Sequence, residues 1–372
     1  MIDLTIRQKV IQAAKYAANR ACLGDHEVVM ATWISRLKAA AEQPDLSQRL
    51  KLAKTQRWAG AAPTWEPVTL HEATSSEPVD VIGIDGSQIF PKLTSPVLWT
   101  YIQAVAYRKL QKPQFVSRFY DIGSEIANGG HPSDELVENR DDLISLTNAW
   151  RTGLEMQLAR MSAEDIHNGS DAAIFFDNGL LPWLSIAGAS AETLVQEYLA
   201  DFCSIRPVTV AGIVSGPQSR LLSRFIHLAE EESVVQGVKD KDSIADIAMM
   251  RYLLTEGERS ALFIHSSPRN DPFTQLGTGV YFFFLHLSLD EIVRVEIPEW
   301  VARDTQAIDR LQASVIADAA PTGYSYVLSQ AHHQAVINMD ISHQLHTAAE
   351  ICYFQETGYL APLRAKTCMK QA

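Results

Sequence analysis

Two short apolar runs that each end in an aspartate are the feature of this sequence that most constrains its fold. Residues 81–85 read VIGID, and residues 171–177 read DAAIFFD. Nearly continuous apolar runs of this length are typical of strands that are covered on both faces of a sheet. A sheet covered on both faces needs helices around it, which favours an α/β fold.

The rest of the main domain alternates strand-like and helix-like segments. Apolar residues recur at helical spacing through residues 134–165 and in three later segments, whereas aromatic and β-branched residues between turn signals indicate strands. We expect strands at 79–85, 95–108, 113–123, 171–177, 208–214, 261–265, 279–288 and 291–298. We expect helices at 134–165, 191–203 and 219–232, and two more after the last strand, of which the second is 324–350. This order predicts an α/β fold with a mixed sheet flanked by helices.

The segments that flank the main domain have a different character. Residues 3–56 carry helical patterns with few breakers, and residues 59–80 then contain three prolines among small and polar residues, which favours a linker. We therefore predict an N-terminal helical arm and linker over residues 1–70, a main domain over residues 79–348 and a C-terminal extension over residues 349–372.

Composition excludes several classes of protein. An apolar content of 47% in 372 residues can bury a substantial core and excludes a disordered chain. The net charge of -12 disfavours a simple DNA-binding module, because a polyanionic partner would need a local basic groove or metal ions. Four widely spaced cysteines without a CxxC pattern argue against a zinc site and a disulfide framework. No apolar stretch reaches the roughly 20 residues of a membrane span, and the charged N-terminus lacks a signal-peptide block, so we expect a cytoplasmic protein.

The two strand-ending aspartates predict a metal site if their strands are neighbours. Asp85 and Asp177 would then converge at the edge where open α/β sheets bind ligands, and Glu155 lies on the predicted helix between them. Carboxylate oxygens suit Mg²⁺ or Mn²⁺. In two-metal sites the ions lie ~4 Å apart, where they activate water and stabilise the leaving oxygen of a phosphoryl transfer.

Each of these acids also has a purely structural explanation. Asp85 and Gly86 could form a tight turn, since Asp and Gly are common in such connections. Asp177 could cap the turn that follows it. Glu155 could belong to a solvated helix face, because the same predicted helix carries several other acids.

Four short motifs, in their order and wide spacing, resemble the NurA nucleases. They are IDGS at Asp85, FFD at Asp177, RVEIP around Arg294 and Glu296, and GYSYVLSQAHHQA near the end of the chain. The resemblance covers Val79 to Ala348, and the first 70 residues match only in being helical. It implies an RNase H-like mixed sheet and a metal-dependent deoxyribonuclease.

The resemblance also implies which residues do the chemistry. Tyr324 and His332 would line the site, and their separation of eight residues is about two helical turns. His332 would ligate the metal or move a proton, although without the resemblance it would be taken for an ordinary, partly buried histidine. The implied catalytic set is Asp85, Glu155, Asp177, Tyr324 and His332, of which Asp85, Glu155, Asp177 and His332 would bind Mn²⁺ or Mg²⁺.

The sequence departs from the family pattern at three places. Asn178 stands where the family has glycine after the second aspartate, Ser325 stands where proline is usual, and residues 214–220 (VSGPQSR) lack an expected lysine. Arg220 would supply the missing positive charge. His333, next to His332, points about 100° away on the same predicted helix and is less suited to the site. The expected DNA contacts are Ser87, Arg220 and Arg294.

The resemblance implies an enzyme that processes DNA ends in repair. It would act as a 5′ to 3′ exonuclease, with single-strand endonuclease activity also compatible, alongside a HerA-type hexameric ATPase. The chain has no Walker A motif and carries 44 acidic against 32 basic residues, so such a partner would supply movement and DNA contacts. We expect a homodimer whose N-terminal helices contribute to self-association or docking; residues 281–287 (YFFFLHL) could contribute as well, or form only a core strand.

Two other function classes stay open at this point. A catalytically inactive NurA-like assembly subunit could keep the fold and lose the activity. An actin-like phosphotransferase would share the acid-glycine-serine segment after the first strand, but it would also need a second glycine-rich phosphate loop and an adenosine motif, which the sequence does not show. Metal-dependent cleavage of DNA separates these classes.

Overall fold

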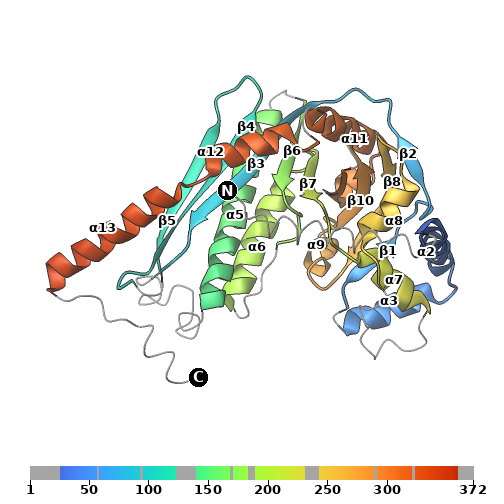
Figure 1. Cartoon of the computed structure of the whole chain (residues 1–372), viewed down its shortest axis with the longest axis horizontal. Coiled ribbons are helices and arrows are strands. Elements are labelled where there is room, and N and C mark those ends of the chain that lie inside the picture. Colours follow the sequence, from blue (N-terminus) through green and yellow to red (C-terminus); the bar gives the residue numbers. More distant parts are fainter. Residues whose placement is uncertain are drawn as a thin grey trace, which may run out of the picture. The chain divides into compact units, whose positions relative to one another are not determined.

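The chain folds into two compact units of α/β structure. The computed structural model describes residues 26–56, 58–92, 95–122, 140–167, 171–182, 189–230, 243–288, 291–320 and 323–358. The first unit consists of residues 1–73, 215–268 and 281–294, and the second consists of residues 74–214, 269–280 and 295–372. The predicted mixed sheet with flanking helices is confirmed, because parallel and antiparallel strand pairs occur together (Figure 1).

The sheet of the second unit carries the two aspartate-bearing strands at its centre. Its strand order is β7-β6-β3-β4-β5, and β11, whose residues 295–298 belong to this unit, is the neighbour of β7. β3 is parallel to β6 and β6 to β7, whereas β4 is antiparallel to both β3 and β5. The strands are β3 (Asp80–Ile89), β4 (Trp99–Arg108), β5 (Gln114–Asp121), β6 (Ala172–Asp177), β7 (Val210–Ser215) and β11 (Ile292–Pro298).

Asp85 lies inside β3 and not at its end, which corrects the expectation of a strand that stops at this residue. β3 continues to Ile89 because its pairing with β4 runs on through Gly86. The parallel pairing with β6 does end here, at the pair Ile84 and Phe176. Asp85 therefore does not begin a turn. Beyond Asp85, β3 remains paired with β4 on one side but is no longer paired with β6 on the other.

Helices pack on the sheet of the second unit. α5 and α6 pack against each other, and α5 also packs on β3 and β4, forming a core with β6 side chains such as Ile174 and Phe176. α12 also packs on β3 and β4 (Figure 1). The beginning of the long helix expected from residue 134 lies outside the described residues. The helices are α5 (Arg140–His167), α6 (Ala189–Ser204), α9 (Asp271–Gln275), α10 (Glu299–Ala302), α11 (Thr305–Ala319), α12 (Tyr326–Ala335) and α13 (Met339–Thr357).

The single last helix expected from the sequence is two helices, α12 and α13. Asn338 caps the start of α13 with its side chain. Side chains from the sheet hold the backbone of the break: Gln103 Nε2 donates to the Ala335 carbonyl at 2.6 Å, and Ser87 Oγ accepts from Ile337 N at 3.3 Å. The sheet thus fixes the point at which α12 ends.

The first unit has its own sheet and core. Its strand order is β1-β9-β10, with β8 joining β2 to β10. β1 and β2 lie within the segment expected to be a linker, and they pair with β9 and β8. The elements are α2 (His26–Ala41), α3 (Leu46–Thr55), α7 (Leu221–Glu230), α8 (Asp246–Leu253), β1 (Gly60–Pro63), β2 (His71–Ala73), β8 (Glu258–Ser260), β9 (Phe263–Ser266) and β10 (Val280–His286).

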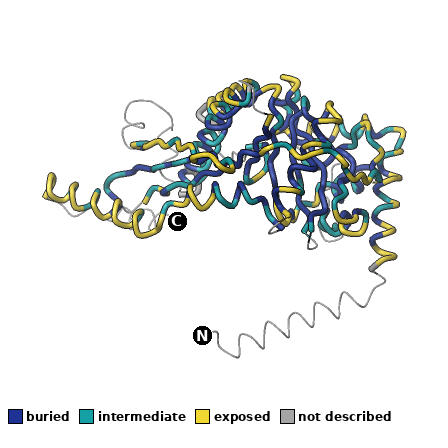
Figure 2. The backbone as a smooth tube through the Cα atoms, turned by 90° about the horizontal axis from the view of Figure 1, so that it is seen from above, coloured by how far each residue is buried: buried dark blue, intermediate teal, exposed yellow. Residues whose placement is uncertain are grey.

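The aromatic run of residues 281–287 is part of the core. Every residue of β10 is buried, and Phe282 and Phe284 pack with Trp33 and Phe225 from the helices of the first unit. Figure 2 colours the backbone by burial and shows the buried segments in dark blue. This run is therefore a core strand and not an exposed docking surface. None of the described helices combines the length and the apolar character that crossing a membrane requires.

Candidate metal centre

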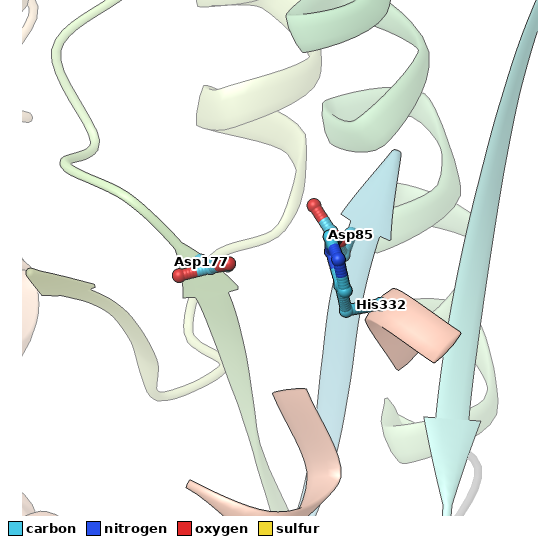
Figure 3. A group of neighbouring side chains, drawn as sticks. All are labelled: Asp85, Asp177 and His332. Atoms are coloured by element: carbon cyan, nitrogen blue, oxygen red, sulfur yellow. Dashed lines mark hydrogen bonds and ion pairs between the residues drawn. The ribbon is translucent and has the colours of Figure 1, made fainter. Parts of the chain in front are cut away.

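Two carboxylates and an imidazole meet at the centre of the second unit. Asp85 on β3, Asp177 at the end of β6 and His332 on α12 each offer a ligand atom, and these atoms lie within 4.8 Å of one another (Figure 3). His332 Nδ1 lies 2.7 Å from Asp85 Oδ2. Asp85 is buried with 4% exposure, whereas the side chain of His332 is 59% exposed. The group is thus anchored inside the sheet and open to solvent on one side.

Strand register and one glycine bring the three residues together. Because Ile84 pairs with Phe176 in parallel strands, the next residues, Asp85 and Asp177, lie side by side. Gly83 then lets α12 approach β3, since a Cβ at this position would lie 2.6 Å from the backbone carbonyl of Val327. Cβ atoms do not approach backbone atoms so closely, so a larger residue at position 83 would push α12 away.

Tyr324 orients Asp177. Its hydroxyl donates to Asp177 Oδ1 at 2.8 Å. Burial and then the charge of Asp177 raise the pKa of Tyr324, so the phenol keeps its proton and acts as a donor. Burial also raises the pKa of Asp177, and the Asp85 charge adds to this, while the hydrogen bond from Tyr324 lowers it. The site therefore holds two carboxylates that repel each other until a cation or proton joins them.

Ser325 fixes the start of the helix that carries His332. It is the N-cap of α12, where its Oγ accepts from Leu328 N at 3.3 Å. The same hydroxyl donates to the buried carboxylate of Asp318 at 2.5 Å. Serine is a strong N-cap residue, so this departure from the family pattern has a structural role.

Glu155 lies next to the centre on α5 but outside the three-residue group. Its side chain is 13% exposed, and its carboxylate takes a hydrogen bond from the backbone of Gly86. A Cβ at Gly86 would lie 2.6 Å from Glu155 Oε1, so only glycine leaves room for this contact. Burial raises the pKa of Glu155 to about 7, Arg151 opposes the shift, and the charges of Asp85 and Asp177 add to it. Among the described residues, the ligand atoms that meet within 4.8 Å are those of Asp85, Asp177 and His332, without Glu155.

Arg151 is a cation of this site that the sequence analysis missed. Its Nη1 lies 3.4 Å from the Gly86 carbonyl, and its Nε lies 3.6 Å from Glu155 Oε1. Together with Glu155, it holds the backbone of Gly86 where the pairing of β3 with β6 has ended. The signal in the sequence was the four-residue spacing of Arg151 and Glu155 on the predicted helix, which places both on one face.

The segment after Asp177 is held by two buried side chains. Glu296 on β11 accepts from Leu180 N at 2.8 Å, and the Tyr198 hydroxyl donates to the Leu180 carbonyl at 2.8 Å. Glu296 is 2% exposed, and a Cβ at Gly179 would lie 2.6 Å from its Oε2. The motif around Glu296 was visible in the sequence, but its partner was not, because 116 residues separate the two.

Asn178 has a backbone conformation that glycine adopts more easily. Its φ is 139°, in the region where side chains with a Cβ are strained. This gives a physical reason for the glycine that the family pattern has at this position. The neighbouring backbone is also close, since a Cβ at Gly212 would lie 2.4 Å from the Asn178 carbonyl.

The three expected DNA contacts lie in different units. Ser87 is on β3, two residues after Asp85, and its hydroxyl holds the break after α12. Arg220 directly precedes α7 in the first unit. Arg294, also in the first unit, has its guanidinium carbon 5.9 Å from the ring centre of Phe282. Burial raises the pKa of Asp246 to about 6, and the charge of Arg294 is one of the contributions that oppose this shift. The DNA-binding roles of all three remain predictions.

The residues that meet here fit a divalent cation. Two carboxylates provide the hard oxygen ligands that Mg²⁺ and Mn²⁺ prefer, and an imidazole is compatible with Mn²⁺. Tyr324 supports Asp177 from outside the group, as second partners of metal ligands commonly do. The structure therefore contains a donor set suited to Mn²⁺ or Mg²⁺, with Asp85, Asp177 and His332 as its members.

One family model identifies the family of this chain. The family model of the NurA domain matches residues 79–337. The crystal structure of the NurA nuclease from Sulfolobus solfataricus is similar with a TM-score of 0.50 and 14% sequence identity, over 96% of this chain and 98% of that chain. The catalytic domain of human Endonuclease V gives a TM-score of 0.31 and 13% identity, over 83% of this chain and 94% of that one. No curated protein matches the chain. Because the family model covers more than half of its length, the chain belongs to the NurA nuclease family.

Proposed function

We propose that this chain is a divalent-metal-dependent nuclease that hydrolyses phosphodiester bonds of DNA. The observation that carries the proposal is the meeting of Asp85, Asp177 and His332 within 4.8 Å at the end of β6. Membership of the NurA family supports the nuclease activity, and the donor set supports the metal dependence. Mn²⁺ and Mg²⁺ are the cations that these ligands fit best.

Each residue of the site has a part in this proposal. A bound cation would activate water and neutralise charge on the phosphate. Asp85, buried within a paired strand, supplies a fixed negative charge for the cation. Tyr324 keeps one oxygen of Asp177 in place through its hydrogen bond. His332 is exposed enough to reach water or substrate, and its imidazole can ligate the cation or move a proton. Glu155 lies beside the group and adds negative charge.

The finer activity follows the family resemblance. We propose 5′ to 3′ digestion of DNA ends in repair, with single-strand endonuclease activity alongside it, and a homodimer that works with a HerA-type hexameric ATPase. The excess of 44 acidic over 32 basic residues supports a partner that contributes DNA contacts. Light scattering after size-exclusion chromatography should show a dimer, and the ATPase with ATP should extend digestion. A monomer that digests long DNA equally well alone would contradict the partnership. The cytoplasmic location stays a prediction.

The decisive experiment is a nuclease assay on end-labelled single-stranded and double-stranded DNA with Mn²⁺, Mg²⁺ or EDTA. We expect cleavage with at least one metal, no cleavage in EDTA, and loss of cleavage in Asp177→Asn. DNA labelled at the 5′ or the 3′ end gives the polarity. A folded protein that cleaves with neither metal, alone or with the ATPase, would instead support the catalytically inactive assembly subunit.

A further inference from the structure

The guanidinium of Arg151 lies beside Glu155, next to the metal centre. Arg151 makes one hydrogen bond within the described part of the chain, a long one of 3.4 Å from Nη1 to the Gly86 carbonyl. Its Nε is buried, has no hydrogen-bond partner among the residues of the described ranges, and lies 3.6 Å from Glu155 Oε1. A guanidinium has five N–H donors in a planar fork, so most of this capacity is not used by the residues that the structure describes.

The position of Arg151 allows contact with a ligand. Its side chain is 23% exposed, so part of the guanidinium reaches solvent. Its charge acts on both Asp177 and Glu155, which places it at the same centre as the metal ligands. Buried polar groups in folded proteins nearly always have partners, and a missing one commonly indicates a ligand, an ion or a catalytic role.

We propose that Arg151 binds the non-bridging oxygens of the DNA phosphate at the metal centre. The inference rests on the proposed nuclease function, because it names a substrate contact of that site. An acidic centre repels the phosphate backbone, so the substrate needs a local cation besides the metal. Arginine suits this role because its fork matches the geometry of phosphate oxygens and it stays charged at all relevant pH values.

This assignment differs from the one made on the sequence, which gave the missing positive charge to Arg220. Arg220 belongs to the first unit, whereas Arg151 and the metal ligands all belong to the second. Gly86 positions Arg151 directly, since a Cβ at Gly86 would lie 3.0 Å from Arg151 Cγ. The helix α5 and the strand β3 thus hold the guanidinium beside Gly86 and Glu155.

The test compares Arg151→Gln with Arg160→Gln in the full-length protein. Arg160 lies on the same helix and is engaged in ion pairs with Glu164 at 3.0 Å and Asp201 at 3.1 Å, so both variants lose one positive charge from α5. The affinity for a fluorescent single-stranded oligonucleotide is measured in Ca²⁺ at several salt concentrations, with the DNA checked to be intact. Each lost phosphate contact should reduce the slope of log K against log salt by about 0.7.

We expect this reduced slope, and a weaker affinity, for Arg151→Gln and wild-type behaviour for Arg160→Gln. With the activating metal, Arg151→Gln should also lower kcat/KM by about 10²-fold, the effect of losing one charge-stabilising donor. Equal slopes for the wild type and Arg151→Gln, or equal losses in both variants, would overturn the proposal. The binding measurement does not depend on cleavage. If the wild type proves inactive, the nuclease function is contradicted, but the comparison of salt slopes still tests whether Arg151 contacts phosphate.

A conservative variant covers the case in which Arg151→Gln does not fold. Arg151→Lys keeps the charge and loses the planar fork. We expect it to retain the salt slope and to lower kcat/KM at least about tenfold, because a point charge cannot make two parallel hydrogen bonds. A lysine variant with the wild-type kcat/KM would refute the proposal that the planar guanidinium of Arg151 binds the phosphate.

Discussion

His332 Nδ1 lies 2.7 Å from Asp85 Oδ2, although 247 residues separate the two in the sequence. The contact joins α12 to the middle of β3, and it brings an exposed imidazole to a carboxylate that is 4% exposed. A cation bound here would either displace the hydrogen bond between the two side chains or be held by both of them. The function of the site can therefore be tested through either partner.

His332→Ala should weaken binding of Mn²⁺ by at least about 10-fold, because loss of a residue that only supports a metal ligand already costs about 10- to 100-fold. Isothermal titration of the metal into the variant measures this directly, without DNA. His333→Ala is the matched control, because His333 is adjacent and also exposed but is not a member of the ligand group. Equal effects of the two substitutions would remove His332 from the site.

Asp85→Asn and Asp177→Asn should each reduce cleavage by at least ~10²-fold, since each removes a charge that holds the cation. Both variants should stay folded, because asparagine keeps the size and much of the hydrogen bonding of aspartate. Removing one of two neighbouring negative charges should even raise the thermal midpoint of the metal-free protein slightly. Circular dichroism and a nuclease assay at saturating metal check both parts. Unfolded variants would indicate that the aspartates have a structural role instead.

The stability of the metal-free protein should depend on Glu155 and on pH. Its pKa in the folded protein is about 7, above the ordinary value of 4.5, so the folded state holds the proton more tightly than the unfolded state. The free energy of unfolding therefore decreases as the pH rises from about 4.5 to about 7. Glu155→Gln removes this loss. The variant should be more stable than the wild type at pH 8 in EDTA and closer to it at pH 5, as urea unfolding would show; the same difference at both values would contradict the prediction.

The same substitution also tests the catalytic assignment of Glu155. Glu155→Gln should impair cleavage, whereas Asp141→Asn should leave it nearly unchanged. Both residues lie on α5, but at 1.5 Å per residue Asp141 is ~20 Å away along the helix. Rates measured at saturating metal give the comparison. A larger loss in the Asp141 variant would show that another acid of α5 serves the site.

Glu296→Ala should destabilise the protein by about 1–3 kcal/mol, because it leaves the buried Leu180 N–H without its acceptor. It should also raise the Mn²⁺ concentration needed for half-maximal cleavage, since Asp177 lies three residues before Leu180. Asp246→Ala is the control: this carboxylate of the first unit is fully buried and accepts from Leu221 N at 2.7 Å. It should lower stability without changing the metal requirement. If the metal requirement shifts in both variants, the shift in the Glu296 variant results from lost stability and not from a displaced Asp177.

Those parts of the molecule that depend on local pattern could be predicted from the sequence. The apolar run before Asp177 is a buried strand as expected, because continuous hydrophobic residues leave few other arrangements. Asp85 was misplaced, since the pair Asp-Gly usually ends a strand and only the ladder with β4 continues this one. The break at Asn338 was missed because no proline or glycine marks it, and the side chains that hold it come from the sheet.

The distant partners of the site could not be predicted either, because they depend on contacts between residues that are far apart in the sequence. The role of Glu296 depends on Leu180, and that of Arg151 depends on the backbone of Gly86. Neither pairing leaves a spacing that can be recognised in one sequence. Asn178 and Ser325 could be recognised as departures from the family pattern, but only the structure shows a strained φ at one and a helix cap at the other.

The two glycines of β3 make this strand intolerant of mutation in a way that a purely structural strand is not. Gly83 and Gly86 are three residues apart, so they face opposite sides of the sheet, one toward α12 and the other toward α5. Gly83→Ala would displace α12, which bears His332 and begins just after Tyr324, and Gly86→Ala would displace Glu155 and Arg151. A single methyl group at either position can thus disable one half of the site although every functional side chain is still present. A homologue that keeps all the acids but lacks one of these glycines should therefore be assayed before nuclease activity is assigned to it.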